Sequence, residues 1–309
     1  MAYFTICIPV YNRKDTIIRT LSSIMTQNFQ SYEVIIVDDG STDGTDIVVK
    51  QYLDEKEDDR YIYIYKENGG KHSALNVGIR NATGKFFLIL DSDDWFVENA
   101  LNSLYSHCVE IENDDTCCGI MGRTINSDTG EIIGDLFDLN NPVSSYFEYH
   151  FILPQKMYVQ DCYEAVKVSI LKQYSYPEQK GMRFVPEAYI FDKIGIKYTL
   201  ILTNDVFRIT EYREDGMTLD KDFKKKNVVG YLYHYISRIE DVIIPRKMPA
   251  FLKIKLLILS WWRYWQCVNI DTKQQGPRIE RITIMGHIVR IVTPIINKIF
   301  EKKYPQYVR

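Results

Sequence analysis

Short apolar segments alternate with amphipathic segments along the first 125 residues, and this alternation restricts the possible folds more than any other feature of the sequence. The apolar segments are rich in Ile, Val, Phe and Tyr, which is typical of buried strands. The segments between them carry apolar residues at helical spacing, as Ile17, Leu21 and Ile24 do. The expected strands are residues 3–10, 32–39, 60–66, 85–90 and 117–123, and the expected helices are residues 15–27, 45–55, 72–82, 98–111 and, farther along, 162–173 and 187–194.

Strands that alternate with helices in this way form parallel βαβ units, so we expect an α/β fold with a mostly parallel sheet and helices on both of its faces. Ligands of such sheets bind beyond the carboxyl ends of the strands. Four polar segments follow strands of this chain, namely residues 11–12, 38–39, 68–70 and 91–94. We therefore expect these segments to meet at one edge of the sheet.

The last of these segments follows the strand FFLIL and contains Asp91, Asp93 and Asp94. Close carboxylates repel one another and raise each other's pKa values, so we expect positive charge beside them. One interpretation is a site for Mg²⁺ or Mn²⁺, which prefer oxygen ligands, and the other is a solvated loop whose aspartates cap the next helix. The pair Asp38-Asp39 at a second strand end favours the ligand site, because two acidic strand ends at one sheet edge are hard to explain as caps alone.

The segment NGGKHSALN resembles the end of a phosphate-binding loop but departs from that pattern. A P-loop needs Gly at position 65 and Ser or Thr at position 72, where this chain has Tyr65 and His72. No G-x-G-x-x-G follows the first strand either. The interpretation of the chain as a kinase, an ATPase or a dehydrogenase therefore loses its main support. Lys71 could still reach a phosphate as a point charge. For His72 we favour a position at the surface or at a helix start.

Four motifs, in this order and spacing, resemble those of the family 2 glycosyltransferases, which have the GT-A fold. They are TICIPVYNR, VIIVDDGSTDGT, NGGKHSALNVGI and FFLILDSDDW. The resemblance covers residues 3–125 closely and residues 158–218 more loosely, through KGMRFVPEAYIFDKIG and EYREDGMT. It implies an inverting hexosyl- or N-acetylhexosaminyltransferase (EC 2.4) that uses a nucleotide sugar and a divalent metal ion.

The resemblance also implies roles for residues at the expected sheet edge. Pro9, Tyr11 and Asn12 match positions that line the nucleotide site, where Tyr11 is able to stack on the base. Asp39 matches a carboxylate that accepts a hydrogen bond from a base N–H. Lys71 falls in a loop that closes over the nucleotide, at a position where the family varies.

Asp91 and Asp93 match the DxD motif of the family, in which Asp91 would face the ribose and Asp93 would coordinate the metal on the diphosphate. The role of Asp94 is the least defined of the three. The implied metal is Mn²⁺ or Mg²⁺, which would stabilise the charge that develops on the departing nucleoside diphosphate. The implied nucleotide is uridine diphosphate, the commonest leaving group of the family.

Inversion also requires a base that takes the proton of the acceptor hydroxyl. The family supplies an Asp or Glu well downstream, often in a Glu-Asp pair that opens a helix. Glu187 is the base that the resemblance implies here, although Ala188 stands where Asp is usual. Asp192 is the alternative base, and a favourable charge in the first turn of a helix would explain Glu187 without catalysis.

Charge is distributed unevenly along the chain, because residues 1–220 carry a net charge of −15 and residues 221–309 carry +12. A basic end of this kind favours an anionic partner, either nucleic acid or an anionic membrane surface. No nucleic-acid-binding module is recognisable, so we expect no nucleic acid. A stripe at helical spacing among these basic residues fits either a core helix or a helix that lies on a membrane, and it consists of Leu252, Leu256, Leu259 and Trp262.

No stretch reaches the ~18 apolar residues of a membrane-spanning helix, and the first residues lack the features of a signal peptide. The six cysteines show no C-x-x-C spacing, so we expect buried free thiols. These features together predict a cytoplasmic protein with peripheral contact to the inner face of the cell membrane. The chain also lacks the Q-x-x-R-W motif of processive synthases, from which we expect one sugar per encounter.

The expected domains are a GT-A catalytic domain over residues 1–218 and a basic, mainly helical region over residues 219–309. Within the catalytic domain, the nucleotide-binding half would be about residues 1–125 and the acceptor-binding half about residues 126–218. The expected function is transfer of a sugar to a hydroxyl of a glycan or lipid-linked acceptor in cell-surface polysaccharide synthesis. The alternative is an inactive module that binds sugar nucleotides or polysaccharide.

Overall fold

The chain divides into two compact units, each described here by itself. The first unit holds residues 1–178 and 197–212, and the second holds residues 179–196 and 213–309. The expected domain boundary at residue 218 stays a prediction, and the end of the motif EYREDGMT lies outside the described residues. The structure is a computed structural model that describes residues 2–153, 157, 161–213, 220–273 and 275–303.

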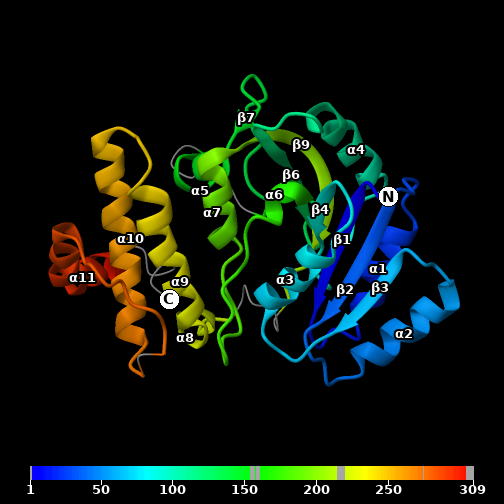
Figure 1. Cartoon of the computed structure of the whole chain (residues 1–309), viewed down its shortest axis with the longest axis horizontal. Coiled ribbons are helices and arrows are strands. Elements are labelled where there is room, and N and C mark those ends of the chain that lie inside the picture. Colours follow the sequence, from blue (N-terminus) through cyan, green and yellow to red (C-terminus); the bar gives the residue numbers. More distant parts are fainter. Residues whose placement is uncertain (1, 154–156, 158–160, 214–219, 274, 304–309) are drawn as a thin grey trace. The chain divides into compact units, whose positions relative to one another are not determined.

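The first unit is built on a single mixed sheet (Figure 1). Its strands are β1 (Phe4–Val10), β2 (Tyr32–Asp38), β3 (Tyr61–Tyr65), β4 (Phe86–Ile89), β5 (Trp95–Phe96), β6 (Cys117–Asn126), β7 (Val143–Ser144), β8 (Tyr163–Lys167) and β9 (Thr199–Thr210). Their order is β3-β2-β1-β4-β8-β6-β9-β5, and β7 also pairs with β9. The four strands β3, β2, β1 and β4 are parallel, whereas β8 is antiparallel to both of its neighbours.

Side chains of a strand alternate between the two faces of a sheet, so the apolar strands of the parallel part present apolar side chains on both faces. Helices cover both of these faces. On one face, residues of β1 such as Ile6 and Ile8 share a core with Leu21 of α1, Val49 of α2 and Leu104 of α4. On the other face α3 approaches β1 closely, and a Cβ at Gly78 would lie 2.3 Å from the Cys7 sulfur. The helices of this unit are α1 (Ile17–Met25), α2 (Thr45–Lys56), α3 (Lys71–Asn81), α4 (Ala100–Ile111), α5 (Tyr146–Phe151) and α6 (Val168–Leu171).

The register of the parallel strands brings their carboxyl ends to one edge. Val10 lies opposite Asp38, and Asp38 lies opposite Tyr65. Cys7 of β1 lies opposite Ile89, the last residue of β4. The polar segments that follow β1, β2 and β4 therefore start side by side, as the strand pattern predicts.

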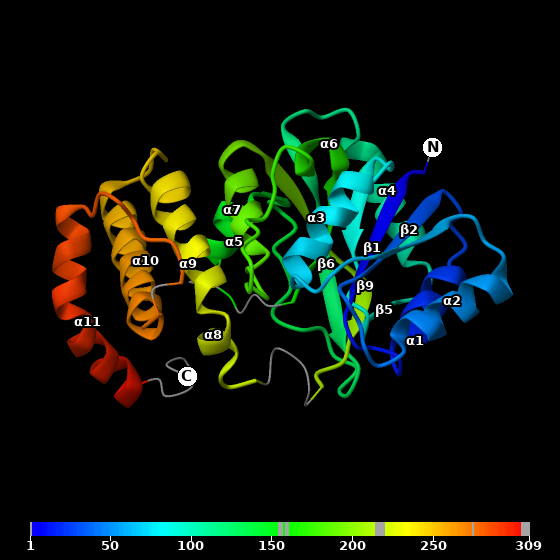
Figure 2. The same cartoon turned by 60° about the horizontal axis from the view of Figure 1, so that its bottom comes forward.

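The second unit is helical and has a core of its own. Its helices are α7 (Ala188–Lys197), α8 (Phe223–Lys226), α9 (Val228–Ser237), the π-helical segment η2 (Arg238–Ile243), α10 (Ala250–Ile270) and α11 (Ile284–Lys303). Figure 2 shows α9, α10 and α11 side by side, and aromatic residues of α10 such as Trp261 and Trp265 pack with Leu232 of α9 and Val289 of α11. None of the described helices combines the length and the apolar content needed to cross a membrane.

The expected strands and helices of the first 125 residues are all present, but the helix expected over residues 162–173 is wrong in its first half. Tyr163–Lys167 is strand β8, and only Val168–Leu171 is helical. β8 lies between β4 and β6 and is largely buried. Its short segment therefore lacks the alternation of apolar and polar residues by which a strand is distinguished from a helix in the sequence. All six cysteines are buried and none forms a disulfide, as their spacing predicts.

Candidate functional site

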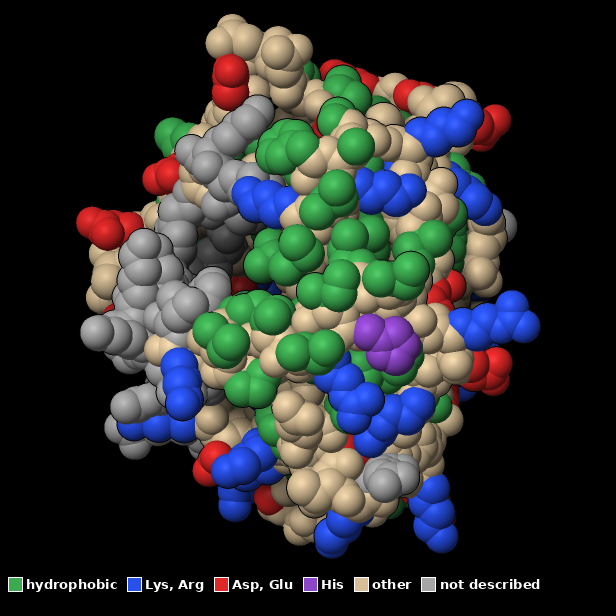
Figure 3. Space-filling model, turned by 90° about the vertical axis from the view of Figure 1, so that its left-hand side faces the viewer, with side chains coloured by type: hydrophobic (Ala, Val, Ile, Leu, Met, Phe, Trp, Pro, Cys, Tyr) green, Lys and Arg blue, Asp and Glu red, His purple; other side chains and the backbone are tan. Residues whose placement is uncertain are grey.

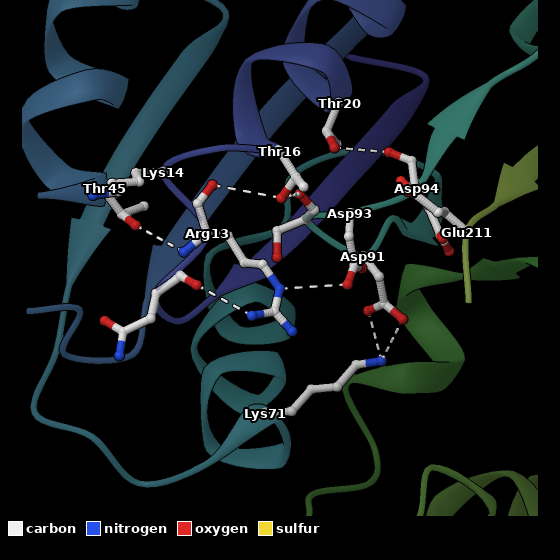
Figure 4. Close-up of polar contacts among 12 residues, drawn as sticks. Arg13, Lys14, Thr16, Thr20, Thr45, Lys71, Asp91, Asp93, Asp94 and Glu211 are labelled. Atoms are coloured by element: carbon white, nitrogen blue, oxygen red, sulfur yellow. Dashed lines mark hydrogen bonds and ion pairs between the residues drawn. The ribbon is translucent and has the colours of Figure 1, made fainter. Parts of the chain in front are cut away.

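The three aspartates after β4 each lie beside a basic side chain of the chain itself, and Figure 4 shows two of these pairs, Lys71 with Asp91 and Arg13 with Asp93. Lys71 Nζ is 2.6 Å from Asp91 Oδ1, and Arg13 Nε is 3.4 Å from Asp93 Oδ2. Asp94 Oδ2 is 3.0 Å from Arg208 Nη1. The positive charge expected next to these carboxylates is therefore present in the protein, from three different elements.

The three carboxylates differ in how accessible they are. The Asp94 side chain is only 3% exposed and its partner Arg208 is also largely enclosed, so this pair holds the loop against β9. Asp93 and Asp91 are 22% and 30% exposed, and the Asp93–Arg13 contact is the longest of the three. A ligand would therefore replace the present partner of Asp93, Arg13, more easily than the partners of the other two aspartates.

The pKa values of Asp91 and Asp93 are displaced in opposite directions. Burial raises the pKa of Asp93, and the charge of Asp91 raises it further. Burial also opposes ionisation of Asp91, but the Lys71 ammonium together with Arg208 and Arg13 outweighs it and holds the pKa of Asp91 below its usual value. This is the expected behaviour of two close carboxylates of which one has the stronger cationic partner.

Hydrogen bonds join the loop after β1 to the loop after β4 (Figure 4). The backbone N–H of Arg13 donates to Thr45 Oγ1 at 2.9 Å, which fixes the start of its side chain. Thr16 Oγ1 donates to the carbonyl of Ser92 at 2.9 Å, and an Arg19 guanidinium N–H donates to the carbonyl of Asp93 at 2.8 Å. The loop that carries Asp91, Asp93 and Asp94, here called the aspartate loop, is therefore held in place through its backbone. The Asp91 and Asp93 side chains, which are paired with Lys71 and Arg13, are not needed for this.

Asp39 and Asp38, at the end of β2, organise the segment that leads into α3. Asp39 accepts hydrogen bonds from the backbone N–H groups of Gly69 and Gly70, at 2.8 and 2.6 Å, and from Lys66 Nζ at 2.6 Å. Gly70 has φ +92°, a conformation that favours glycine. Asp38 accepts a hydrogen bond from the Tyr63 hydroxyl at 2.6 Å. The second acidic strand end thus has a structural task, whatever else it binds.

The residues after β1 lie at the same edge. Pro9 is part of β1 and lies opposite Val37 of β2. Tyr11 is exposed, and Asn12 has φ +52° and accepts a hydrogen bond from the Thr42 N–H at 2.8 Å. The structure brings these positions to the edge that also carries Asp39, Asp91 and Asp93, and their contacts with a nucleotide remain predictions.

Lys71 differs from its expected setting, because it is the first residue of α3 and not part of a loop. The loop ends one residue earlier, at Gly70, whose positive φ separates it from the helix. Lys71 therefore projects toward Asp91 from a helix that is packed against the sheet.

His72 does lie at a helix start, but its side chain is buried and not at the surface. Its ring lies edge-on to the Tyr176 ring, with 6.5 Å between the centroids. Within the described part of the chain, Nδ1 has no hydrogen-bond partner. Burial disfavours the protonated ring and lowers the pKa of His72 to about 4.

We expect this histidine to make the protein less stable in acid. The unfolded chain takes up a proton near pH ~6.5 and the folded chain only near pH 4, so the unfolded state binds more protons between these values. Stability from this group is complete above pH ~6.5 and falls by about 3 kcal/mol as the pH decreases to 4. Urea unfolding of His72→Gln at several pH values should show a smaller acid loss than wild type. The exposed-site control His287→Gln should keep the wild-type dependence, and identical profiles for His72→Gln and wild type would contradict the assignment.

Glu187 and Asp192, the two candidate bases, belong to the second unit, which is described separately from the aspartate loop. Glu187 directly precedes α7 and is partly exposed. Asp192 is buried within α7 and accepts a hydrogen bond from Arg238 Nε at 2.6 Å. This buried ion pair gives Asp192 a structural role and favours Glu187 as the candidate base.

Sequence reasoning missed Arg13 and Arg208, two of the three cationic partners. Arg13 stands directly after the tyrosine-asparagine pair in the first motif, so its proximity to the sheet edge could have been noticed. Arg208 lies in β9, a strand for which no expectation was made, and its sequence indication is a charge among the apolar residues of VFRI.

The donor set at this edge is compatible with Mg²⁺ or Mn²⁺. Asp91 and Asp93 offer carboxylate oxygens, which these hard cations prefer. Among the described residues, no group of three or more His, Cys, Asp or Glu side chains is placed to hold a metal ion. A cation here would therefore take one or two carboxylates and complete its coordination with substrate phosphates and water.

Curated relatives of this chain include bacterial proteins that are named glycosyltransferases. Glycosyltransferase GlyG of Streptococcus pneumoniae serotype 4 is 34% identical over 273 residues, which cover 82% of this chain and 85% of GlyG. The minor teichoic acid biosynthesis protein GgaB of Bacillus subtilis is 31% identical over 303 residues, which cover 94% of this chain but only 32% of GgaB. The match also spans only 16% of the length of the S. pneumoniae glycosyltransferase GlyA, which is 36% identical over 110 residues.

Solved structures share the fold at low sequence identity. S. aureus TarS 1–349 in complex with UDP-GlcNAc has a TM-score of 0.62 and 17% identity, over 97% of this chain and 81% of that one. The mannosyltransferase PcManGT from Pyrobaculum calidifontis, in complex with GDP-Man and Mn²⁺, has a TM-score of 0.56 and 18% identity, over 98% of this chain and 87% of that one. The profile of glycosyl transferase family 2 matches residues 5–175, more than half of the sequence. On this match and the similarity to GlyG along most of both chains, the protein belongs to glycosyl transferase family 2.

Proposed function

We propose that this protein transfers one sugar, with inversion, from a nucleotide diphosphate sugar to a hydroxyl of a glycan or lipid-linked acceptor in cell-surface polysaccharide synthesis. The observation that carries the proposal is the pair of accessible carboxylates, Asp91 and Asp93, at the carboxyl edge of the sheet in a family 2 chain. The teichoic acid role in the name of GgaB supports the polysaccharide pathway. The UDP-GlcNAc bound to TarS supports a UDP-sugar as donor.

Donor binding would use the edge formed by the ends of β1 and β2. The exposed Tyr11 ring would stack on the base, beside Pro9 and Asn12. Asp39 Oδ2 accepts one hydrogen bond in the structure, from Gly70, and a carboxylate oxygen can accept a second one from a base N–H. Asp91 would face the ribose.

The diphosphate would meet the aspartate loop and its two accessible cations. Mn²⁺ or Mg²⁺ on Asp93 would supply a Lewis acid that stabilises the leaving diphosphate. Arg13 and Lys71, now paired with Asp93 and Asp91, are close enough to exchange a carboxylate for a phosphate oxygen. Binding would thus replace the Arg13–Asp93 and Lys71–Asp91 pairs with phosphate contacts, while the metal ion would neutralise Asp93 and the ribose hydroxyls would donate hydrogen bonds to Asp91.

Glu187 would accept the proton of the acceptor hydroxyl as that oxygen attacks the anomeric carbon from the face opposite the diphosphate. Its partial exposure suits a group that meets a second substrate, whereas Asp192 is enclosed and paired with Arg238. A cytoplasmic site of action with peripheral contact to the inner face of an anionic membrane would bring the protein to a lipid-linked acceptor.

Release of nucleoside diphosphate from a panel of nucleotide sugars, with and without Mn²⁺, tests the proposal. We expect one donor, a UDP-sugar, to be turned over with metal present and to lose most of its turnover when the metal is chelated. An inactive binding module would instead bind a sugar nucleotide and release no product from any donor, and this result would overturn the proposed activity.

A further inference from the structure

Helix α11 has apolar residues on two faces, and only one of them packs inside the second unit. Val289 lies on the packed face and is buried in the core shared with α9 and α10. The other face is exposed, with Ile291 the most accessible after Ile284, at 76% and 81%. The exposed residues recur at intervals of four, three and four, which places them in one stripe along the helix, and they are Ile284, Ile288, Ile291 and Ile295.

Helix α10 carries a second apolar stripe, half of which α11 covers. The stripe follows helical spacing and consists of Phe251, Ile254, Ile258, Trp262 and Trp265. Trp265 Nε1 donates to the carbonyl of Gly286 at 2.9 Å, and Trp262 Nε1 donates to Asn297 Oδ1 at 2.8 Å, so α11 covers these two residues. In the described part of the chain, the first three residues of the stripe remain exposed.

Basic side chains accompany the exposed apolar residues. Figure 3 shows hydrophobic side chains gathered on the face of this unit, with Lys and Arg side chains around them. Residues 221–309 carry a net charge of +12. Exposed basic residues of α10, α11 and the segments before them include Lys247, Lys255, Arg281, Arg290 and Lys298.

This combination of groups distinguishes among the partners that could cover the surface. A second copy of the chain would bring two strongly basic regions together, which repel one another. A nucleic acid would satisfy the charge but would not bury a stripe of isoleucines. The interface of an anionic bilayer offers both a hydrocarbon boundary and negative headgroups.

We propose that the exposed stripes of α10 and α11 form a membrane-docking surface, on which the isoleucines and Phe251 enter the headgroup boundary of an anionic bilayer. The flanking Lys and Arg side chains would pair with the lipid headgroups. This inference rests on the peripheral membrane contact in the proposed function and does not depend on the chemistry at the aspartate loop.

Sedimentation of the full chain with vesicles tests the surface. The vesicles are phosphatidylcholine alone or an equimolar mixture with phosphatidylglycerol. The test variant is Ile288→Asn/Ile291→Asn, and the matched control is Ile47→Asn/Val109→Asn, which alters two exposed apolar residues on helices α2 and α4 of the first unit. A third variant, Arg281→Gln/Lys298→Gln, removes charge and leaves the stripe intact.

We expect wild type and the control to bind the anionic vesicles and to bind them less at high salt. The Ile288→Asn/Ile291→Asn variant should lose on the order of tenfold in vesicle affinity, and the charge variant should approach the weak binding seen with phosphatidylcholine alone. Thermal unfolding and nucleoside diphosphate release should be unchanged in each variant, which separates this result from a failure of the catalytic proposal.

Three outcomes would overturn the docking surface. They are no vesicle binding by wild type, equal binding by wild type and the Ile288→Asn/Ile291→Asn variant, and a lipid-free dimer of wild type that this variant loses. The last result would assign the surface to self-association.

Discussion

Replacing Asp93 with asparagine should lower kcat/KM for the turned-over nucleotide sugar by a factor on the order of 10²–10³. The substitution keeps the shape of the side chain and removes the charge that would hold the divalent cation. The fold should survive, because Asp93 is partly exposed and its ion pair with Arg13 is long at 3.4 Å. Initial rates over a range of Mn²⁺ concentrations measure the effect.

Asp46→Asn is the matched control for this substitution. Asp46 is a partly exposed aspartate of α2 that also has a basic partner, Lys50, at 3.2 Å. Its loss should leave the rate unchanged, since ion pairs at the surface contribute about 0–1 kcal/mol. Wild-type turnover by Asp93→Asn would remove this carboxylate from the mechanism.

Replacing Glu187 with glutamine should lower kcat by about 10²–10⁴, the range attributed to a positioned general base. Donor binding should be unaffected, because the proposed base would act on the acceptor hydroxyl and the proposed nucleotide site is at the carboxyl edge of the sheet. Fixed-time activity assays with acceptor present measure kcat, and calorimetric titration with the donor measures its affinity, so the two quantities are obtained separately.

Asp192→Asn tests the alternative base and should behave differently. Asp192 is buried against Arg238, and removal of one partner of a buried ion pair costs about 3–5 kcal/mol. Urea unfolding should show that loss, whereas Glu187→Gln should lose less stability, because Glu187 is partly exposed. If Glu187→Gln keeps full activity while folded Asp192→Asn has none, the assignment of the base is reversed.

The sequence predicts the parallel half of the sheet because each of its strands is followed by a helix of clear periodicity. Ile17, Leu21 and Ile24 all reach the core, as their spacing indicates. The same logic brings the loop after β4 to the edge shared with β1 and β2. The antiparallel half has no such pattern: β8 has five residues and leads directly into α6, so its partners β4 and β6 decide its conformation.

The sequence could not reveal which groups supply the positive charge beside the aspartates. The triplet of aspartates predicts a nearby positive charge, but it does not say whether that charge is a metal or a side chain. Arg208 reaches Asp94 from β9, more than a hundred residues away along the chain, and no local pattern links the two. Likewise, the sequence predicts a stripe of α10 that includes Leu256 and Trp262, both of which are buried. It does not reveal the exposed stripe that begins at Phe251, and only the structure shows that α11 covers Trp262 and Trp265.

The central claim is that Asp93 and its neighbours bind a divalent cation and a nucleotide sugar together. Calorimetric titration of wild type and Asp93→Asn with UDP-GlcNAc, each with and without Mn²⁺, tests it most directly. The account predicts at least tenfold tighter binding of the nucleotide with Mn²⁺ in wild type, a coupling of about 1.4 kcal/mol, and none in the variant. Equal affinity of wild type with and without Mn²⁺, or full coupling in Asp93→Asn, would contradict it.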